Sequence, residues 1–213
     1  MSSETPQIQV NTEHYDFSRY VSWERWSSYW HQLHEIDAVR PNDVLCIGIG
    51  DDIVPSILQR KGYAVSRFDF DPALRPDYVG GVDHVRESVD GRIFDAVLCC
   101  QVLEHQPFEI LAGTVEQLLS ITKSRLVVSL PYSHVPMLRL KLRLYRSVLA
   151  DLDLLVQKFW KSWKFDGEHY WEVGARGFPM SRIGPVFDRD GFRTRHFHAK
   201  EHPYHLFLVM DRL

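Results

Sequence analysis

The sequence of 213 residues contains only three cysteines, and it has neither a long apolar segment nor a strong net charge. Cys46, Cys99 and Cys100 cannot all pair, and they lie in apolar runs, so we interpret them as buried, reduced thiols. No run approaches the roughly 20 apolar residues that a membrane-spanning helix needs, and no signal-peptide pattern opens the sequence. We therefore expect a soluble, cytoplasmic protein without a disulfide scaffold.

Charge and composition limit the range of partners and domains. The formal net charge of -3 creates no field that would draw the whole molecule to nucleic acid, so nucleic acid is not an expected partner. Hydrophobic residues make up 45% of the chain, which is enough for a large core, and the sequence shows no internal repeat. These features predict a single α/β domain over residues 1–213, or one such domain with an appended lobe.

Residues 43–71 combine a strand, a glycine turn, a helix and a second strand. An apolar run ending at Ile47 is broken by Gly48 and Gly50, and apolar residues at helical spacing follow. The second predicted strand, residues 63–70, carries Asp69 near its end, roughly 20 residues after the glycines, where a carboxylate can accept two ribose hydroxyls. The pattern indicates a nucleoside-binding βαβ unit.

The glycine turn favours a cationic nucleoside over a dinucleotide. A dinucleotide fingerprint needs a third glycine where this chain has Ile53. Asp51 and Asp52 would also face the pyrophosphate, and like charges about 5 Å apart cost roughly 3 kcal/mol. S-adenosylmethionine (SAM) carries a ribose and a positively charged sulfonium, so it suits the turn better. An ordinary turn without a ligand remains the alternative.

Further strands and helices alternate through the rest of the chain. Strands are predicted at 77–82, 94–100 and 125–130, helices at 106–121 and 180–190, and a closing strand pair at 192–197 and 205–210. This alternation predicts a doubly wound, mostly parallel sheet with helices on both faces. Asp83 directly follows the strand at 77–82, where it could accept a hydrogen bond from an adenine amino group, although a solvated loop aspartate fits equally well.

The N-terminal region divides into a polar segment and an aromatic helix. The first 18 residues are polar, and we expect them to be loose. Residues 19–36 form a predicted cap helix whose one face carries Trp23, Trp26, Trp30 and Leu33. We predict that this aromatic face packs on the sheet; the alternative is that Tyr20 or Trp23 also closes over a ligand.

Residues 132–171 form a long insertion after the strand at 125–130. Leu138 to Leu144 alternate with basic residues at period 2, which predicts an extended half. The second half is predicted to be helical, because its apolar residues follow helical spacing: Val148, Leu152, Leu155 and Phe159.

The end of this insertion mixes lysines with aromatic residues. Lys158, Lys161 and Lys164 lie beside Trp160 and Trp163, which is the composition of an interfacial segment. Three roles stay open: a lid over the site, a dimer-forming lobe, and a peripheral membrane contact through residues 138–164.

Several motifs occur in an order that resembles a known family. They are GxG at 48–50, the acid at 69, PDYVGGV at 76–82, LEH at 103–105 and GEHYWEV at 167–173. Together they resemble the class I SAM-dependent methyltransferases, most closely the bacterial type 11 group. The resemblance implies a Rossmann-like sheet of seven strands with the last antiparallel, and SAM lying across the carboxyl ends of the first two strands.

The resemblance also assigns residues to the cofactor. It places Gly48 and Gly50 against the methionine part of SAM, Asp69 on the ribose and Asp83 by the adenine. The floor near the sulfonium is formed by residues 99–102, which include Gln101 and Val102.

Two positions depart from the family pattern. Cys46 stands where the family usually has an acid, and Asp52 stands where it often has a third glycine. The implied function is methyl transfer from SAM to oxygen of a small or surface-bound acceptor. A SAM-binding protein without activity and a nucleotide-binding interaction module are the alternatives.

The LEH step further resembles the ExxEH motif of metal-dependent small-RNA and ubiquinone-pathway O-methyltransferases. The corresponding residues are Gln101, Glu104 and His105, with His169 as a later histidine. The neutral amide of Gln101 replaces an acid, which weakens a site for a hard cation such as Mg²⁺. Glu104 and His105 could instead cap the following helix, or His105 or His169 could act as a general base. We predict His105, His169 and Glu104 as catalytic residues, and no metal.

Overall fold

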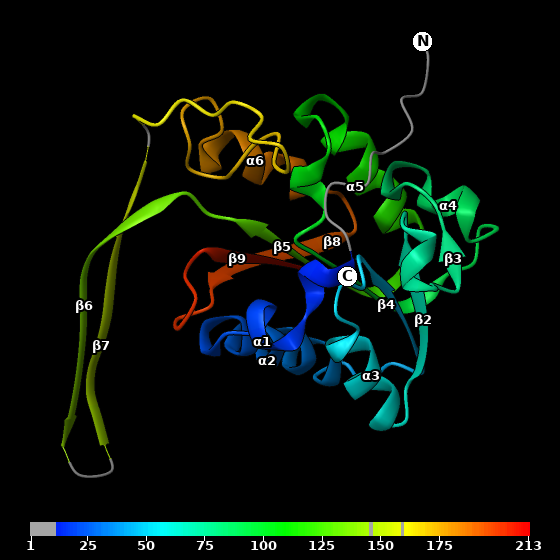
Figure 1. The fold of residues 1–213 in the computed structure, drawn as a ribbon, viewed down its shortest axis with the longest axis horizontal. Coiled ribbons are helices and arrows are strands. Elements are labelled where there is room, and N and C mark those ends of the chain that lie inside the picture. Colours follow the sequence, from blue (N-terminus) through cyan, green and yellow to red (C-terminus); the bar gives the residue numbers. More distant parts are fainter. Residues whose placement is uncertain (1–11, 145–146, 159) are drawn as a thin grey trace.

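The computed structural model describes residues 12–144, 147–158 and 160–213, which form a seven-stranded sheet and a separate two-stranded hairpin (Figure 1). The sheet strands are β1 (Asp43–Ile47), β2 (Ala64–Asp69), β3 (Tyr78–Val79), β4 (Phe94–Cys100), β5 (Thr122–Pro131), β8 (Phe192–His198) and β9 (His205–Arg212). The hairpin strands are β6 (His134–Leu144) and β7 (Ser147–Gln157). The helices are α1 (Phe17–Tyr20), α2 (Trp23–Asp37), α3 (Ile53–Arg60), α4 (Val85–Ser88), α5 (Leu111–Ser120) and α6 (Met180–Phe187).

The sheet has the strand order β3-β2-β1-β4-β5-β9-β8. The first five of these strands are parallel, and β9 runs antiparallel to both β5 and β8. The expected doubly wound sheet of seven strands with an antiparallel last strand is therefore confirmed. The chain order reverses between β1 and β4, and ligands of such sheets bind in the crevice at the carboxyl ends of strands at this switch point.

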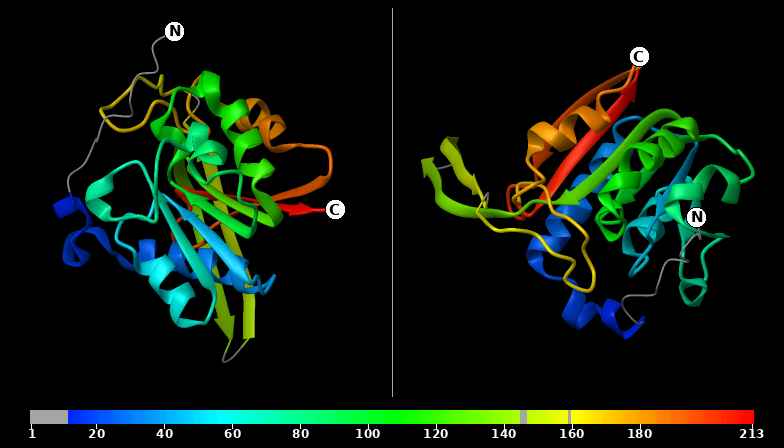
Figure 2. Two further views of the ribbon diagram at one scale, coloured as in Figure 1. Left: turned by 90° about the vertical axis from the view of Figure 1, so that its right-hand side faces the viewer. Right: turned by 90° about the horizontal axis from the view of Figure 1, so that it is seen from above.

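Helices cover both faces of the sheet (Figure 2). Successive side chains of β1 point to opposite faces, so Val44 and Cys46 pack with α2 and α3 while Leu45 and Ile47 pack with α5 and α6. Among the described residues no helix combines the length and hydropathy needed to cross a bilayer. The three cysteines are free thiols, and Cys46 and Cys99 are fully buried in these two cores.

The orientation of α2 differs from the prediction. Its aromatic face is exposed, with Trp23 and Trp30 at 72% and 55% exposure, while the opposite face, including Tyr29 and Ile36, is buried. The buried face includes polar residues, which form hydrogen bonds with residues far away in sequence. Ser28 bonds His202. Glu35 bonds Arg125 and Arg195. The predicted packing of the tryptophans on the sheet is wrong, and helical spacing alone could not reveal these pairings.

The insertion also differs from the prediction in its second half. The extended first half is confirmed as β6, but residues 147–157 form β7 rather than a helix, and Phe159 lies outside the described residues. Leu152 and Leu154 alternate with Asp151 and Asp153, a period-2 signal that the helical spacing of the other apolar residues hid. The hairpin projects away from the sheet (Figures 1 and 2).

Candidate functional site

The two glycines after β1 have positive φ angles, which glycine adopts without strain. Gly48 has a φ of +72°, and a Cβ there would overlap Val102 of the turn after β4. Gly50 has a φ of +51°, and a Cβ there would lie 3.3 Å from the ring of Tyr15. The glycine turn therefore packs between the turn after β4 and the N-terminal segment.

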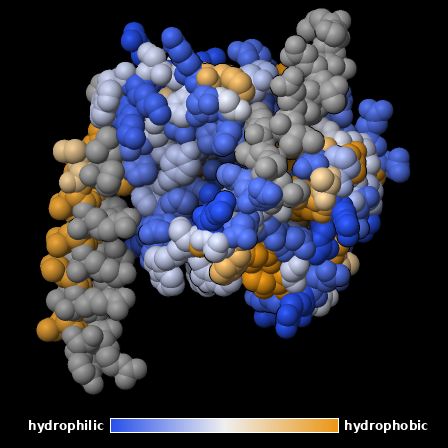
Figure 3. Space-filling model, viewed as in Figure 1, coloured by the Kyte–Doolittle hydropathy of each residue, from blue (hydrophilic) through white to orange (hydrophobic). Residues whose placement is uncertain are grey.

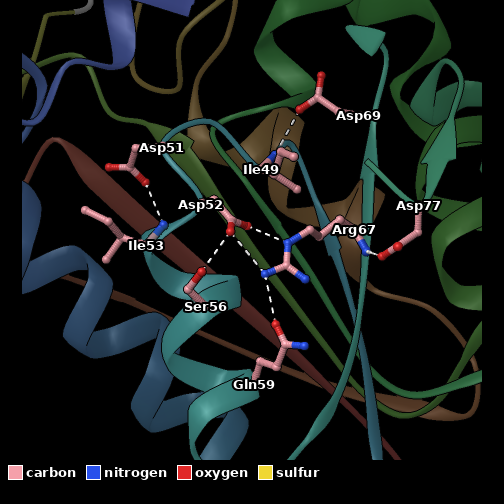
Figure 4. A network of polar contacts seen from close by, with 9 residues as sticks. All are labelled: Ile49, Asp51, Asp52, Ile53, Ser56, Gln59, Arg67, Asp69 and Asp77. Atoms are coloured by element: carbon pink, nitrogen blue, oxygen red, sulfur yellow. Dashed lines mark hydrogen bonds and ion pairs between the residues drawn. The ribbon is translucent and has the colours of Figure 1, made fainter. Parts of the chain in front are cut away.

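Asp69 at the end of β2 holds this turn in place. Its Oδ2 accepts a hydrogen bond from the backbone N–H of Ile49 at 2.9 Å (Figure 4). Its Oδ1 accepts one from the N–H of Asp71 at 3.0 Å. Burial raises the pKa of Asp69, while these two N–H groups and that of Phe70 oppose the shift. Asp69 therefore lies at the strand-end crevice, beside the glycine turn.

Asp51 and Asp52 are both engaged by the protein. Asp52 adopts a left-handed conformation with a φ of +58°, and its carboxylate binds the Arg67 guanidinium through contacts of 2.6 and 3.1 Å (Figure 4). Asp51 accepts hydrogen bonds from the Ile53 N–H and from the Tyr29 hydroxyl. The charge argument against a dinucleotide is therefore weaker for Asp52, because Arg67 compensates the charge of its carboxylate.

The N-terminal segment covers the crevice instead of being loose over residues 12–18. A 3-10 turn, Thr12–Tyr15, leads into α1, and the rings of Tyr15 and Tyr20 lie 5.1 Å apart. Burial raises the pKa of Tyr15, and the charges of Tyr20, Asp69 and Asp71 add to this rise. Burial likewise raises the pKa of Tyr20, with the carboxylates of Asp51, Glu104 and Glu168 among the further causes. The two tyrosines thus lie among the carboxylates at the strand ends.

The turn after β4 contacts the glycine turn, β5 and Asp83. Gln101 has a φ of +55°, and its amide nitrogen donates to the Ser129 hydroxyl at 3.2 Å. Val102 lies against Gly48, as described above. Gln106 reaches Asp83 at 3.5 Å, so Asp83 borders the same turn.

Glu104 is the most unusual carboxylate of the site. It is fully buried, and neither of its carboxylate oxygens has a hydrogen-bond partner among the described residues. Burial raises the pKa of Glu104 to about 7, with His169 opposing the shift. A buried, unpaired carboxylate is costly, and such groups are concentrated where a protein binds or reacts.

Two histidines complete a cluster with Glu104. Ligand atoms of Glu104, His105 and His169 lie within 4.8 Å of one another. Burial lowers the pKa of His105 to about 4, and its Nδ1 donates to the carbonyl of Glu168 at 3.0 Å. Burial opposes protonation of His169 as well, but its hydrogen bond to Glu172 and the nearby charges raise its pKa. At neutral pH the two imidazoles therefore differ in basicity.

The sequence did not point to Glu172 and Tyr204. Glu172 is buried, lies 3.4 Å from His169 Nδ1, and accepts a hydrogen bond from the Tyr204 hydroxyl at 2.6 Å. Glu172 belongs to the GEHYWEV motif three residues after His169, which was the one local signal for it. Tyr204 precedes β9, and no pattern linked it to the motif.

The predicted site residues therefore fall into two neighbouring groups. The first group is the glycine turn itself, Gly48 and Gly50, with Asp69 and Val102 beside it. The second group is the cluster after β4, which consists of Glu104, His105 and His169. Asp83 joins the β4 turn through Gln106, whereas the amide nitrogen of Gln101 is directed to β5.

Comparison with known proteins identifies the fold. Neither a protein-family model nor a curated protein matches the sequence. Among solved structures, the chain is similar to the methyltransferase domain of bacterial CtHen1, with 14% identity, a TM-score of 0.60 and coverage of 88% of this chain and 99% of that one.

Two further solved structures are enzymes with S-adenosylhomocysteine bound. The 1,6-didemethyltoxoflavin N1-methyltransferase of Burkholderia thailandensis gives 16% identity, a TM-score of 0.58, and coverage of 94% and 84%. Magnesium protoporphyrin IX methyltransferase of Synechocystis PCC 6803 gives 14% identity, a TM-score of 0.54, and coverage of 91% and 89%. The chain thus has the class I SAM-dependent methyltransferase fold.

Proposed function

We propose that this protein is a SAM-dependent methyltransferase that transfers the methyl group to oxygen of a small or surface-bound acceptor. One observation carries the proposal: the Asp69 carboxylate binds the backbone of the glycine turn at the switch point of a methyltransferase fold. This supports a cofactor that is recognised through its ribose, because ligands of such sheets bind at that crevice.

The residues around the turn fit SAM. A carboxylate offers about four lone-pair positions, and Asp69 uses two of them for backbone N–H groups, so two can still accept ribose hydroxyls. Val102 fills the space beside Gly48, so no side chain fits at this position of the turn. Asp83 is proposed to accept from the adenine amino group.

SAM supplies a methyl group on a sulfonium that is already activated for transfer. The main task of the chain is to hold the acceptor in line with that methyl group, which can contribute roughly 7 to 11 kcal/mol of barrier reduction. Tyr15 and Tyr20 cover the strand ends and would exclude water from the reacting atoms.

The cluster after β4 is proposed to manage the acceptor proton. His169 takes the proton of an acceptor hydroxyl at Nε2, while Glu172 binds Nδ1 and fixes the ring orientation. The Nδ1–H of His105 donates to the Glu168 carbonyl. In this tautomer the Nε2 of His105 is unprotonated and can accept a hydrogen bond beside Glu104 and His169. General-base help of this kind is worth roughly 10² to 10⁴ in rate.

The carboxylate of Glu104 has no partner within the described part of the chain, which favours a second function of the same cluster, the binding of a divalent cation. Glu104, His105 and His169 offer one carboxylate and two imidazoles, a donor set that suits Zn²⁺ or Mn²⁺ better than Mg²⁺. A bound cation would act as a Lewis acid and lower the pKa of an acceptor hydroxyl. Gln101 contributes no charge to such a site.

Transfer of tritium from labelled SAM to fractionated cell metabolites tests the enzyme directly. We expect label in at least one fraction, and isothermal titration should show SAM binding without any metal. Binding without transfer to any fraction would support the inactive SAM-binding alternative, and no binding at about 1 mM SAM would remove both. Transfer that stops with EDTA and returns with Mn²⁺ or Zn²⁺ would favour the cation over the general base.

A further inference from the structure

The β6-β7 hairpin exposes a continuous ladder of leucines. The register pairs Leu138 with Leu154 and Leu140 with Leu152, and these four side chains are between 39% and 53% exposed. Leu142 and Leu144 extend the same row toward the tip, with exposures of 49% and 67%. Figure 3 shows hydrophobic side chains along the edge of the hairpin that faces away from the sheet.

The hairpin is anchored at its root but uncovered along its length. At the root, Leu155 packs against the main core and the Lys158 N–H donates to the Ser133 carbonyl at 3.1 Å. An isolated two-stranded hairpin is marginally stable in water, and a long exposed apolar strand promotes association. The leucine ladder therefore needs a partner that covers it.

Charge in this part of the chain differs from charge in the rest. Residues 138–164 contain seven basic and two acidic residues, although the whole chain has a net charge of -3. Close to the root, Trp160 is 56% exposed, and the Lys161 ammonium lies 4.2 Å from the centre of the Trp163 ring. Apolar, aromatic and basic residues together match the boundary of an anionic membrane, where aromatic rings and lysines are favoured.

A second copy of the chain fits the ladder less well. Each strand has 11 residues, so one face of the hairpin measures roughly 36 by 10 Å, about 360 Å². Two hairpins packed face to face would bury about 700 Å², below the roughly 1,200 Å² of stable interfaces. Such a dimer would also bring two basic segments together, whereas an anionic surface attracts them.

We propose that the leucine face of the hairpin docks on an anionic phospholipid surface, with the lysines near its root, Lys158, Lys161 and Lys164, in the headgroup region. We expect the hairpin to lie on the bilayer surface and not to span the bilayer, because the leucines occupy one face of a two-stranded ribbon. The docking needs neither SAM nor an acceptor, so it can fail or hold independently of the proposed function.

Vesicle flotation of the full chain tests this proposal. The vesicles contain either phosphatidylcholine alone or phosphatidylcholine with about one-third phosphatidylserine, at low and high salt. Wild type should partition at least tenfold more strongly to the anionic vesicles, and high salt should weaken that binding. The variant Leu140→Thr/Leu152→Thr keeps β propensity at a cross-strand pair and should lose at least tenfold in partitioning.

Matched controls separate docking from folding. Ile93→Thr removes an equally exposed apolar residue, 57% exposed, before β4 and should float like wild type. Leu154→Thr provides a second ladder variant, and thermal unfolding checks that each variant is folded.

Three outcomes would overturn the proposal. The first is that wild type floats with neither kind of vesicle. The second is that the ladder variants float as well as wild type. The third is that size-exclusion chromatography with light scattering shows a dimer that Leu140→Thr/Leu152→Thr abolishes, without vesicle binding, which would assign the face to a second copy.

Discussion

Around the glycine turn, the carboxylates of Asp51, Asp52 and Asp69 all accept hydrogen bonds, whereas in the cluster after β4 the buried Glu104 accepts none from any residue that the structure describes. The first arrangement stabilises the fold and pre-forms a binding surface before any ligand arrives. The second arrangement lowers stability and keeps a reactive group ready. The difference indicates that the glycine turn binds the cofactor and that the cluster around Glu104 takes part in the reaction.

The largest expected effect comes from Glu104→Gln. The amide keeps the shape of the side chain but removes the negative charge beside His105 and His169, so methyl transfer should fall, by at most the roughly 10² to 10⁴ that the general base contributes. The free energy of unfolding at pH 8 should rise by about 1 to 3 kcal/mol, because the variant no longer buries a charge. The ordinary pKa of a glutamate is 4.5 and that of Glu104 is about 7, so the folded state binds the proton more tightly. The stability gap should therefore grow as pH rises from 4.5 to 7 and level off above it.

Denaturant titrations and single-turnover assays measure these two effects. Glu116→Gln is the matched control, because Glu116 is 70% exposed and should change neither quantity. If Glu104→Gln were less stable than wild type at pH 8, the contrast between the glycine turn and the cluster after β4 would be wrong.

Asp69→Ala should weaken SAM binding by about tenfold to a hundredfold, because it removes charge-assisted hydrogen bonds worth roughly 1.5 to 3 kcal/mol each. It should also lower stability, since the Ile49 and Asp71 N–H groups lose their acceptor. Calorimetric titration measures the affinity. Asp95→Ala is the control: Asp95 likewise accepts a backbone N–H, from Asn42, but at the opposite end of the sheet. Equal losses of affinity in both variants would contradict a ribose role for Asp69.

Glu172→Gln tests whether Glu172 positions His169. The amide can still accept from Tyr204, but it no longer favours the charged imidazole, so the pKa of His169 should fall. A general base works when neutral; hence the rise of kcat/KM with pH should move to lower pH, and the maximal rate should drop by about tenfold.

Glu172→Gln should also change how the free energy of unfolding depends on pH. A raised histidine pKa stabilises the fold fully below the ordinary value of 6.5, and this contribution is lost as pH rises through the folded value. The stability difference between wild type and Glu172→Gln should therefore shrink at high pH. Glu168→Gln serves as control, because Glu168 accepts from His105 through its backbone carbonyl, which the substitution keeps. An unchanged pH midpoint in Glu172→Gln would assign Glu172 a structural role.

The smallest effect is expected for Asp52→Gly. Glycine adopts the left-handed conformation without strain, which offsets the lost ion pair with Arg67, so SAM affinity should stay within about threefold of wild type. Asp52→Ala also loses the ion pair, but alanine remains strained in the left-handed conformation, so this variant should be less stable than Asp52→Gly by about 1 kcal/mol. Thermal unfolding of the pair checks this order, and equal stabilities would show that the conformation carries no strain.

The sequence predicted the parts of the fold that depend on local patterns. The buried run of β4 was predicted at its observed bounds, and the spacing from Gly48 to Asp69 was enough to place an acid beside the glycine turn. The orientation of α2 was missed because Glu35 is buried only through its bonds to Arg125 and Arg195, which are far away in sequence. Tyr204 was missed for the same reason, since folding alone brings it to Glu172. Glu172 lies only three residues after His169, but its burial and its contact with His169 could not be read from the motif.

Titration of SAM into the wild-type chain tests the central claim, that the glycine turn and Asp69 form a cofactor site. We predict one SAM bound per chain, with a dissociation constant well below about 1 mM and without added metal. Absence of heat and of any thermal stabilisation at that concentration would contradict the account.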